Sequence, residues 1–261
     1  MEPTQRMPTL FVGHGNPMNA ILDNQWTRGW TEMARTIRKP KSILMLSAHW
    51  YLPGSYTTAN HDPKTIHDFG GFAQALFDVQ YRAPGNPGLA NRVSAMLSHC
   101  DSQPRSDWGL DHGTWSVLCK MYPEADVPVI QLSIDARATF EQHLKIGRTL
   151  APLRDEGILI MGSGNLVHNL RSALHQMRAN DQSVPNWARH FDDEASRALK
   201  QGDNDFLAEA PTTEEGRMCH PSPDHYIPLL YAAGAADSND PVSFPVEGFE
   251  LGLSMRCVRF G

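Results

Sequence analysis

The chain has 261 residues, enough to bury the core of one large α/β domain or two small ones. Its apolar share of 41%, charged share of 20% and net charge of −6 are ordinary for a soluble globular protein, and no block of Lys or Arg indicates a nucleic-acid or anionic-membrane partner. No stretch is apolar enough to span a bilayer and residues 1–9 lack the apolar segment of a signal peptide, so the expected compartment is the cytoplasm.

Strands and helices are predicted to alternate along the chain. Continuous apolar or β-branched runs predict strands that are buried on both faces, as in a parallel sheet. These strands cover residues 9–12, 43–46, 127–134 and 157–161, with a shorter one at 57–59. Helical spacing and capping residues predict helices over 25–37, 86–98, 140–150, 186–200 and 225–233. Alternating residues at 242–244 and 251–260 resemble edge strands. The predicted fold class is therefore α/β, a single domain over residues 1–261 with a central mixed, mostly parallel sheet flanked by helices.

Three of the predicted strands are followed by turns of small residues that carry a histidine. His14 lies in GHGNP, His49 in SAHW and His168 in GSGNLVHNL. Ligand sites in open α/β sheets form where loops leave the carboxyl ends of the strands, so three imidazoles are expected on one rim. A single such histidine is more often a hydrogen-bonded core or loop residue than a ligand. Two of them directly after buried strands favour a divalent metal site with His14 and His49 as ligands.

Three further histidines lie in unusual sequence contexts. His112 in WGLDHGTW is predicted in a tight turn, where the alternative is a loop histidine between two core tryptophans. His225 in PDHYIP either points inward or is a helix-start residue that interacts with Asp224. His67 in TIHDFGGF lies in a loop that is expected to cover a pocket. The other histidines are predicted to have no part in the site: His61, His99, His143, His175 and His190 are expected on the surface, and His220 is expected to be structural.

The sequence lacks the motifs that are typical of several other common enzyme classes. The four cysteines, Cys100, Cys119, Cys219 and Cys257, form no CxxC pair and are expected to be ordinary buried or half-buried thiols. The sequence contains no G-x-S-x-G nucleophile motif, no P-loop, no dinucleotide-binding glycine pattern and no HExxH helix. The histidine cluster is therefore the main functional signal.

Six motifs occur in one order along nearly the whole chain: GHGNPMN, SAHW, TIHDFGGF, WGLDHGTW, GSGNLVHNL and PDHYIPLLY. This set resembles the class III, LigB-type extradiol ring-cleaving dioxygenases, and within them the 4,5-DOPA dioxygenase extradiol subgroup of plants and bacteria. The resemblance implies a LigB-like α/β fold with a central mixed sheet. It also implies one divalent metal ion per chain, a small catechol substrate and O₂.

The resemblance also implies roles for particular residues. His14, His49 and His225 match the metal ligands. His168 matches a histidine beside the metal that serves acid–base steps and is a further potential ligand, and His112 matches a second histidine of the pocket. Many extradiol enzymes use two histidines and a carboxylate, so Asp224 is a rival to His225. A three-histidine site binds Zn(II) readily, so the expected ions are Fe(II) for the reaction and Zn(II) as found in the protein.

The expected reaction is opening of the ring of a catechol such as DOPA, beside its two oxygens. His168 is expected to act as the base toward a substrate hydroxyl, and His112 as a hydrogen-bond donor or acid. The aromatic candidates for the wall that holds the ring are Trp50, His67, Phe69, Trp115 and Tyr226. Core packing is the alternative for these residues, above all for Trp115. A zinc-dependent hydrolase and a non-catalytic metal-binding protein are the other two hypotheses, and neither consumes O₂.

Overall fold

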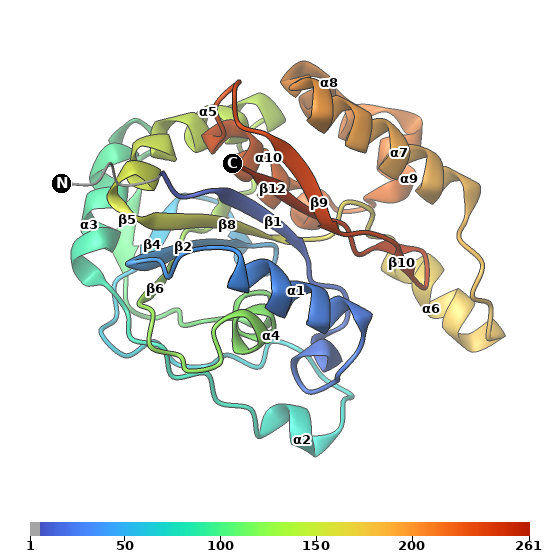
Figure 1. The fold of residues 1–261 in the computed structure, drawn as a ribbon, viewed down its shortest axis with the longest axis horizontal. Helices are drawn as coiled ribbons and strands as arrows, with labels where there is room; N and C mark the ends of the chain where they lie inside the picture. Colours follow the sequence, from blue (N-terminus) through green and yellow to red (C-terminus); the bar gives the residue numbers. More distant parts are fainter. Residues whose placement is uncertain (1–5) are drawn as a thin grey trace.

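A six-stranded sheet forms the centre of the computed structural model, which describes residues 6–261 (Figure 1). The strand order is β6-β2-β8-β1-β12-β9. These strands are β1 (Thr9–Gly13), β2 (Ser42–Ser47), β6 (Val129–Gln131), β8 (Ile158–Gly164), β9 (Val242–Val246) and β12 (Cys257–Phe260). The first four strands of that order run parallel, β12 is antiparallel to β1, and β9 is antiparallel to β12. The sheet confirms the predicted α/β class with a mixed, mostly parallel sheet.

Helices cover both faces of the sheet because its central strands are apolar on both sides. Along β1, Leu10 and Val12 pack into one core cluster whereas Phe11 packs into another, as the two-residue period of a strand requires. One face carries α1 (Gln25–Arg35) and α4 (His112–Met121). The other carries α3 (Pro87–Met96), α5 (Phe140–Leu150), α7 (Asn186–Gln201), α8 (Asn204–Glu209) and α10 (Ile227–Ala235). The remaining helices are α2 (Gln74–Phe77), α6 (Leu170–Ala179) and α9 (Glu214–Cys219).

The predicted elements differ from the structure where the local pattern is ambiguous. The strand predicted over 127–134 is two strands, because the chain leaves β6 and pairs β7 (Ile134–Asp135) with β3 (Tyr51–Leu52). The segment 251–260 is interrupted: β10 (Phe249–Glu250) turns back through two residues of positive φ into β11 (Leu253–Ser254) before β12 begins. A third small sheet pairs β4 (Tyr56–Thr58) with β5 (Gln103–Arg105).

Helix α4 was predicted as a turn, and the reason lies in its surroundings. Asp111 caps its first turn, with its side chain accepting a hydrogen bond from the backbone N–H of Thr114. Its first seven residues, 112–118, are all buried, so it lacks the polar face that makes an amphipathic helix visible in a sequence. His112 is therefore the first residue of a buried helix rather than the tip of a tight turn.

The structure also tests the predicted burial of His143 and of the cysteines. His143 was placed on the surface, which is wrong: it is fully buried, with Nδ1 2.9 Å from the Tyr231 hydroxyl. All four cysteines are free, two of them buried and two half-buried, as expected.

Within residues 6–261, the helices are too short or too polar for any of them to cross a membrane.

Glycines allow α5 and α10 to pack closely, and this contact gives a first test of the fold. A Cβ added at Gly234 of α10 would overlap the backbone carbonyl of Leu144 in α5. We expect Gly234→Ala to lower the free energy of unfolding by about 1–3 kcal/mol, because two rigid backbones must separate. Gly88→Ala in α3 is the matched control, since the nearest atom to its added Cβ is 3.5 Å away. Chemical denaturation of both variants measures the difference, and equal stability of the two would contradict the close packing.

Candidate metal centre

Five histidines gather at the carboxyl edge of the parallel strands. His14, His49 and His168 follow β1, β2 and β8, which are neighbours in the sheet. His112 begins α4, and His225 ends a 3-10 turn, Pro223–His225, just before α10. The ring centroid of His14 lies 5.2 Å from those of His49 and His225, and the ring of His49 lies 3.7 Å from that of His112. His168 stacks on His225 at 3.6 Å. The structure therefore brings together every histidine that the sequence singled out for metal binding or acid–base chemistry.

Hydrogen bonds fix which nitrogen of His14 carries its proton. The Ser163 hydroxyl lies 3.0 Å from Nδ1 of His14 and donates its own hydrogen to the Gly113 carbonyl at 2.6 Å. Because that hydroxyl hydrogen is already used, Nδ1 of His14 must be the donor of the pair. Nε2 of His14 is then unprotonated. His14 is 1% exposed, and burial followed by the neighbouring histidines lowers its pKa well below the usual value, so the ring stays neutral.

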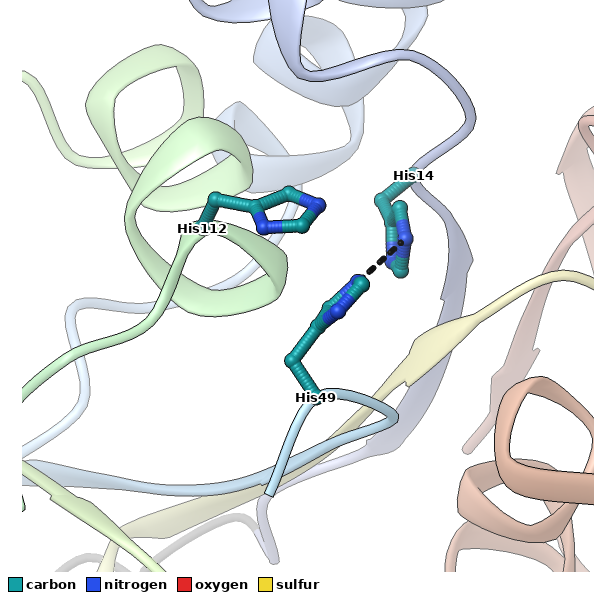
Figure 2. Close-up of side chains that lie close together, drawn as sticks. All are labelled: His14, His49 and His112. Carbon is teal, nitrogen blue, oxygen red and sulfur yellow. Dashed lines mark hydrogen bonds between the residues drawn. The ribbon is translucent and has the colours of Figure 1, made fainter. Parts of the chain in front are cut away.

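His49 faces His14 in a geometry that suits a shared cation (Figure 2). Its Nδ1 lies 3.4 Å from the Asp68 carboxylate, which favours a proton on that nitrogen. Its Nε2 lies 3.3 Å from Nε2 of His14, at hydrogen-bond distance, so both nitrogens face the same point. Ligand nitrogens about 2.0–2.1 Å from a tetrahedral metal are themselves roughly 3.3 Å apart. The donor set therefore fits a metal ion that binds both Nε2 atoms.

Two histidines compete for the third position. Ring nitrogens of His14, His49 and His112 all lie within 4.8 Å of one another (Figure 2). The ring of His225 is 5.0–5.2 Å, centroid to centroid, from the rings of His49 and His14. Nδ1 of His225 contacts the Asp224 carboxylate, which leaves its Nε2 free for a metal. Asp224 thus has the position of a partner that orients His225, rather than that of a ligand in its place.

His112 is held by the same carboxylate as His49. Its Nδ1 lies 3.0 Å from Oδ2 of Asp68, and its backbone N–H donates to Oδ1 at 2.9 Å. The next residue, Gly113, allows this close approach, because a Cβ there would lie 2.9 Å from Cδ2 of His49 and would overlap the Ser47 hydroxyl. The absence of a side chain at Gly113 thus brings the start of α4 against the metal site.

His168 lies beside this group with a half-buried, neutral ring. Burial lowers its pKa to about 4, against the opposing charge of Asp224. Its backbone N–H donates to the Cys219 carbonyl at 3.0 Å, and Nε2 of His220 lies 2.9 Å from the Leu166 carbonyl. His220 is buried and helps to hold this loop, which agrees with the structural role expected for it. A neutral imidazole at this position can accept a proton from a substrate that binds beside His225.

The five aromatic candidates for the wall that holds the substrate ring differ in their burial. Phe69 and His67 are half-buried, and the ring of Phe69 lies 5.3 Å from that of His112. Trp50 is buried and stacks on Trp108. Trp115 and Tyr226 are fully buried and donate hydrogen bonds to the carbonyls of Ile66 and Leu207, respectively. Core packing accounts for Trp115 and Tyr226, whereas Phe69 borders the histidine group and His67 lies behind it, 5.8 Å from Phe69 between ring centroids.

Three polar residues of the centre were not singled out from the sequence. They are Asp68, Ser163 and Asn165. The Asn165 side chain accepts from the Gly15 N–H at 3.3 Å and donates to the Ser254 carbonyl at 2.8 Å. Its backbone N–H donates to the His225 carbonyl at 3.0 Å. Asn165 therefore ties the loops that carry His14 and His225 together. The available signal was its place, with Ser163, in the small-residue turn after a buried strand.

The contact between Ser163 and His14 gives a second test. We expect Ser163→Ala to weaken zinc binding by about 10–100-fold, because Nδ1 of His14 loses the acceptor that fixes its tautomer. Ser116→Ala is the matched control: Ser116 is equally buried in α4, and its hydroxyl has no hydrogen-bond partner among residues 6–261. Competition with a chromophoric chelator measures the affinity. Equal affinities in the two variants would show that Ser163 does not orient His14.

The chain is similar over nearly its whole length to one protein family, to two curated proteins and to one solved structure described here. Residues 7–253 match the model of the catalytic LigB subunit of aromatic ring-opening dioxygenase. The 4,5-DOPA dioxygenase extradiol of Escherichia coli (strain K12) is 46% identical over 98% of this chain and 95% of its own length. That of Beta vulgaris is 39% identical over 94% of this chain and 92% of its own length. The crystal structure of an uncharacterized protein from Escherichia coli K12 superimposes with a TM-score of 0.85 at 42% identity, covering 98% of this chain and 100% of that one.

Proposed function

Because the chain belongs to the LigB family of aromatic ring-opening dioxygenases, we propose that it opens a catechol ring with O₂ at a metal held by His14, His49 and His225. Metal-dependent ring opening is the activity of the family. The catechol, with DOPA as the first candidate, is suggested by the names of the relatives. The whole chain, residues 1–261, is proposed to act as one catalytic domain, since the family model spans residues 7–253.

The observation that carries the proposal is the pair of Nε2 atoms, 3.3 Å apart, on His14 and His49. Nδ1 of His14 is hydrogen-bonded to the Ser163 hydroxyl and Nδ1 of His49 faces the Asp68 carboxylate, which favours hydrogen on both and leaves both Nε2 lone pairs for the same ion. We propose Fe(II) as the ion for the reaction and Zn(II) as the ion that the purified protein retains. When bound, the metal supplies a Lewis acid that lowers the pKa of the catechol hydroxyls and the redox centre that O₂ chemistry requires.

The third ligand in this proposal is His225 rather than His112. His225 is oriented by Asp224, and its position matches the family motif PDHY. With His225 as ligand, His112 remains free on the other side of His49, with Phe69 against it. This division leaves one histidine on each side of the metal for proton transfer, His168 beside His225 and His112 beside His49.

These two histidines divide the proton transfers. His168 accepts the proton of one substrate hydroxyl, since its ring is neutral and lies against the proposed ligand His225. His112 holds and returns a proton at the opposite side, with Asp68 as its partner. Half-buried Phe69 next to His112, with half-buried His67 behind it, forms one wall for the aromatic ring and keeps water from it.

Oxygen consumption with a panel of catechols, after anaerobic loading with Fe(II), tests the function. We expect O₂ uptake and a yellow ring-opened product with at least one catechol, and no uptake with the zinc-loaded protein. A zinc-dependent hydrolase would act without O₂ and without iron. A metal-binding protein without catalytic function would take up the ion and transform none of the catechols.

A further inference from the structure

One carboxylate, that of Asp68, contacts two histidines of the centre. Its Oδ2 lies 3.0 Å from Nδ1 of His112 and 3.4 Å from Nδ1 of His49. Its Oδ1 accepts the backbone N–H of His112 at 2.9 Å. The backbone of Asp68 is exposed, but its side chain is only 18% exposed, so the carboxylate points inward from the loop.

The position of the Asp68 carboxylate suits an anion that accepts hydrogen bonds. Its Oδ1 accepts the first backbone N–H of α4, where the partial positive charge of the helix favours an anion. An ionised carboxylate accepts hydrogen bonds and donates none, so it favours hydrogen on the two Nδ1 atoms that face it.

The contact between Asp68 and His112 is close but bent. Nδ1 of His112 is at hydrogen-bond distance from Oδ2, yet its N–H does not point straight at that oxygen. The same oxygen faces Nδ1 of His49, whose ring centroid is 3.7 Å from that of His112. One carboxylate therefore faces both rings at the nitrogen whose protonation defines their tautomers.

We propose that Asp68 is a positioning residue that fixes the nitrogen roles of a metal ligand and of a proton-transfer histidine together. With hydrogen on Nδ1, His49 presents an unprotonated Nε2 to the metal. By the same contact, hydrogen on Nδ1 of His112 leaves its Nε2 as the nitrogen that exchanges a proton on the substrate side. This inference rests on the proposed function for its catalytic part and is independent of it for its tautomer and metal-binding parts.

The test variant is Asp68→Asn, which keeps the size of the side chain but offers an N–H₂ group where Oδ2 was. An amide that keeps Oδ1 on the His112 N–H must turn its donor toward the two imidazoles, which then favours hydrogen on Nε2. We expect zinc affinity to fall about 10–100-fold. We expect kcat to fall at least about 100-fold with KM changed less, as when a triad aspartate is replaced by asparagine. Asp62→Asn, an exposed carboxylate of the same loop, is the control and should change neither.

Nuclear magnetic resonance gives a measurement that does not depend on turnover. Long-range ¹H–¹⁵N spectra of the zinc-loaded protein distinguish the two imidazole tautomers, and His112→Gln assigns the signal of His112. We expect the Nδ1–H form for His112 in the wild type and a shift toward the Nε2–H form in Asp68→Asn. An Nε2–H form in the wild type would overturn the proposal, as would unchanged zinc affinity and kcat in the variant.

These measurements distinguish failure of the proposed reaction from failure of the positioning role of Asp68. If no catechol is cleaved by the wild type but the tautomer and the zinc affinity respond to Asp68→Asn, the proposed reaction fails and the positioning role stands. If the wild type cleaves a catechol and the variant matches it in tautomer, affinity and kcat, the positioning role fails alone. Thermal unfolding of the metal-free variant, expected within a few degrees of the wild type, excludes general unfolding as the cause.

Discussion

Replacing His14 by alanine is expected to abolish stoichiometric metal binding and to lower kcat/KM on a catechol by at least about 10³-fold. The Lewis acid accounts for several kcal/mol of transition-state stabilisation, and each 1.36 kcal/mol corresponds to a factor of ten. His14 is 1% exposed and its Nδ1 is hydrogen-bonded to Ser163, so its replacement removes a ligand whose orientation is fixed. Elemental analysis after zinc loading and oxygen-electrode rates after iron loading measure the two effects.

His61→Ala is the control for this experiment, because His61 is an exposed histidine outside the group of five. It should leave metal content and turnover unchanged. Full metal occupancy in His14→Ala would contradict the proposed centre.

The same measurement decides between the two candidates for the third ligand. We expect His225→Ala to lose the metal, as His14→Ala does. We expect His112→Ala to keep the metal but to lose turnover, because His112 serves proton transfer in the proposed mechanism. The opposite result, with metal lost only in His112→Ala, would assign the coordinating trio to His14, His49 and His112, the three whose ring nitrogens lie closest together.

The second large effect is expected in stability, at a buried ion pair behind the centre. Nε of Arg256 lies 3.1 Å from both carboxylate oxygens of Asp192 in α7, and the Ser254 hydroxyl donates to the same carboxylate at 2.6 Å. The side chains of Asp192 and Arg256 are 4% and 6% exposed. Removing one partner of a buried pair costs about 3–5 kcal/mol, since the other charge remains buried. We expect about 3 kcal/mol for Asp192→Ala, because Glu247 still contacts Arg256.

For a chain of this size, such a loss lowers the melting temperature by roughly 6–12 °C. Asp193→Ala is the matched control, one residue further along α7 and exposed, and it should change stability by less than about 0.5 kcal/mol. Calorimetry of the two variants makes the comparison. A difference of less than about 1 kcal/mol between them would show that the pair contributes little to stability.

The histidine centre could be predicted as far as its residues follow regular strands. His14 and His49 are placed by β1 and β2, whose apolar runs are visible in the sequence and whose carboxyl ends must share one edge of the sheet. The roles of His225 and His168 came from the family resemblance. The position of His112 could not be predicted, because α4 is buried all round and has no amphipathic period.

The direction of the Asp68 side chain could not be predicted from the sequence, for a different reason. Asp68 lies in a long irregular segment whose path is set by contacts distant in sequence, such as the hydrogen bond from the Trp115 indole to the Ile66 carbonyl. Thr65 forms an isolated β-bridge with Leu110, just before the start of α4. A loop held by such contacts has no local pattern from which the direction of a carboxylate follows.

The proposed ligands come from widely separated parts of the chain, and this has a consequence for unfolding. His14 follows β1, His49 follows β2, and His225 precedes α10, so a single ion would join two points in the first third of the polypeptide to one in the last third. Such an ion acts as a reversible cross-link that closes two long loops at once. Its binding energy is then also folding energy, because the separated imidazoles cannot hold it together in the unfolded chain. In this protein the ion that takes part in the reaction would therefore also stabilise the folded arrangement of the strands.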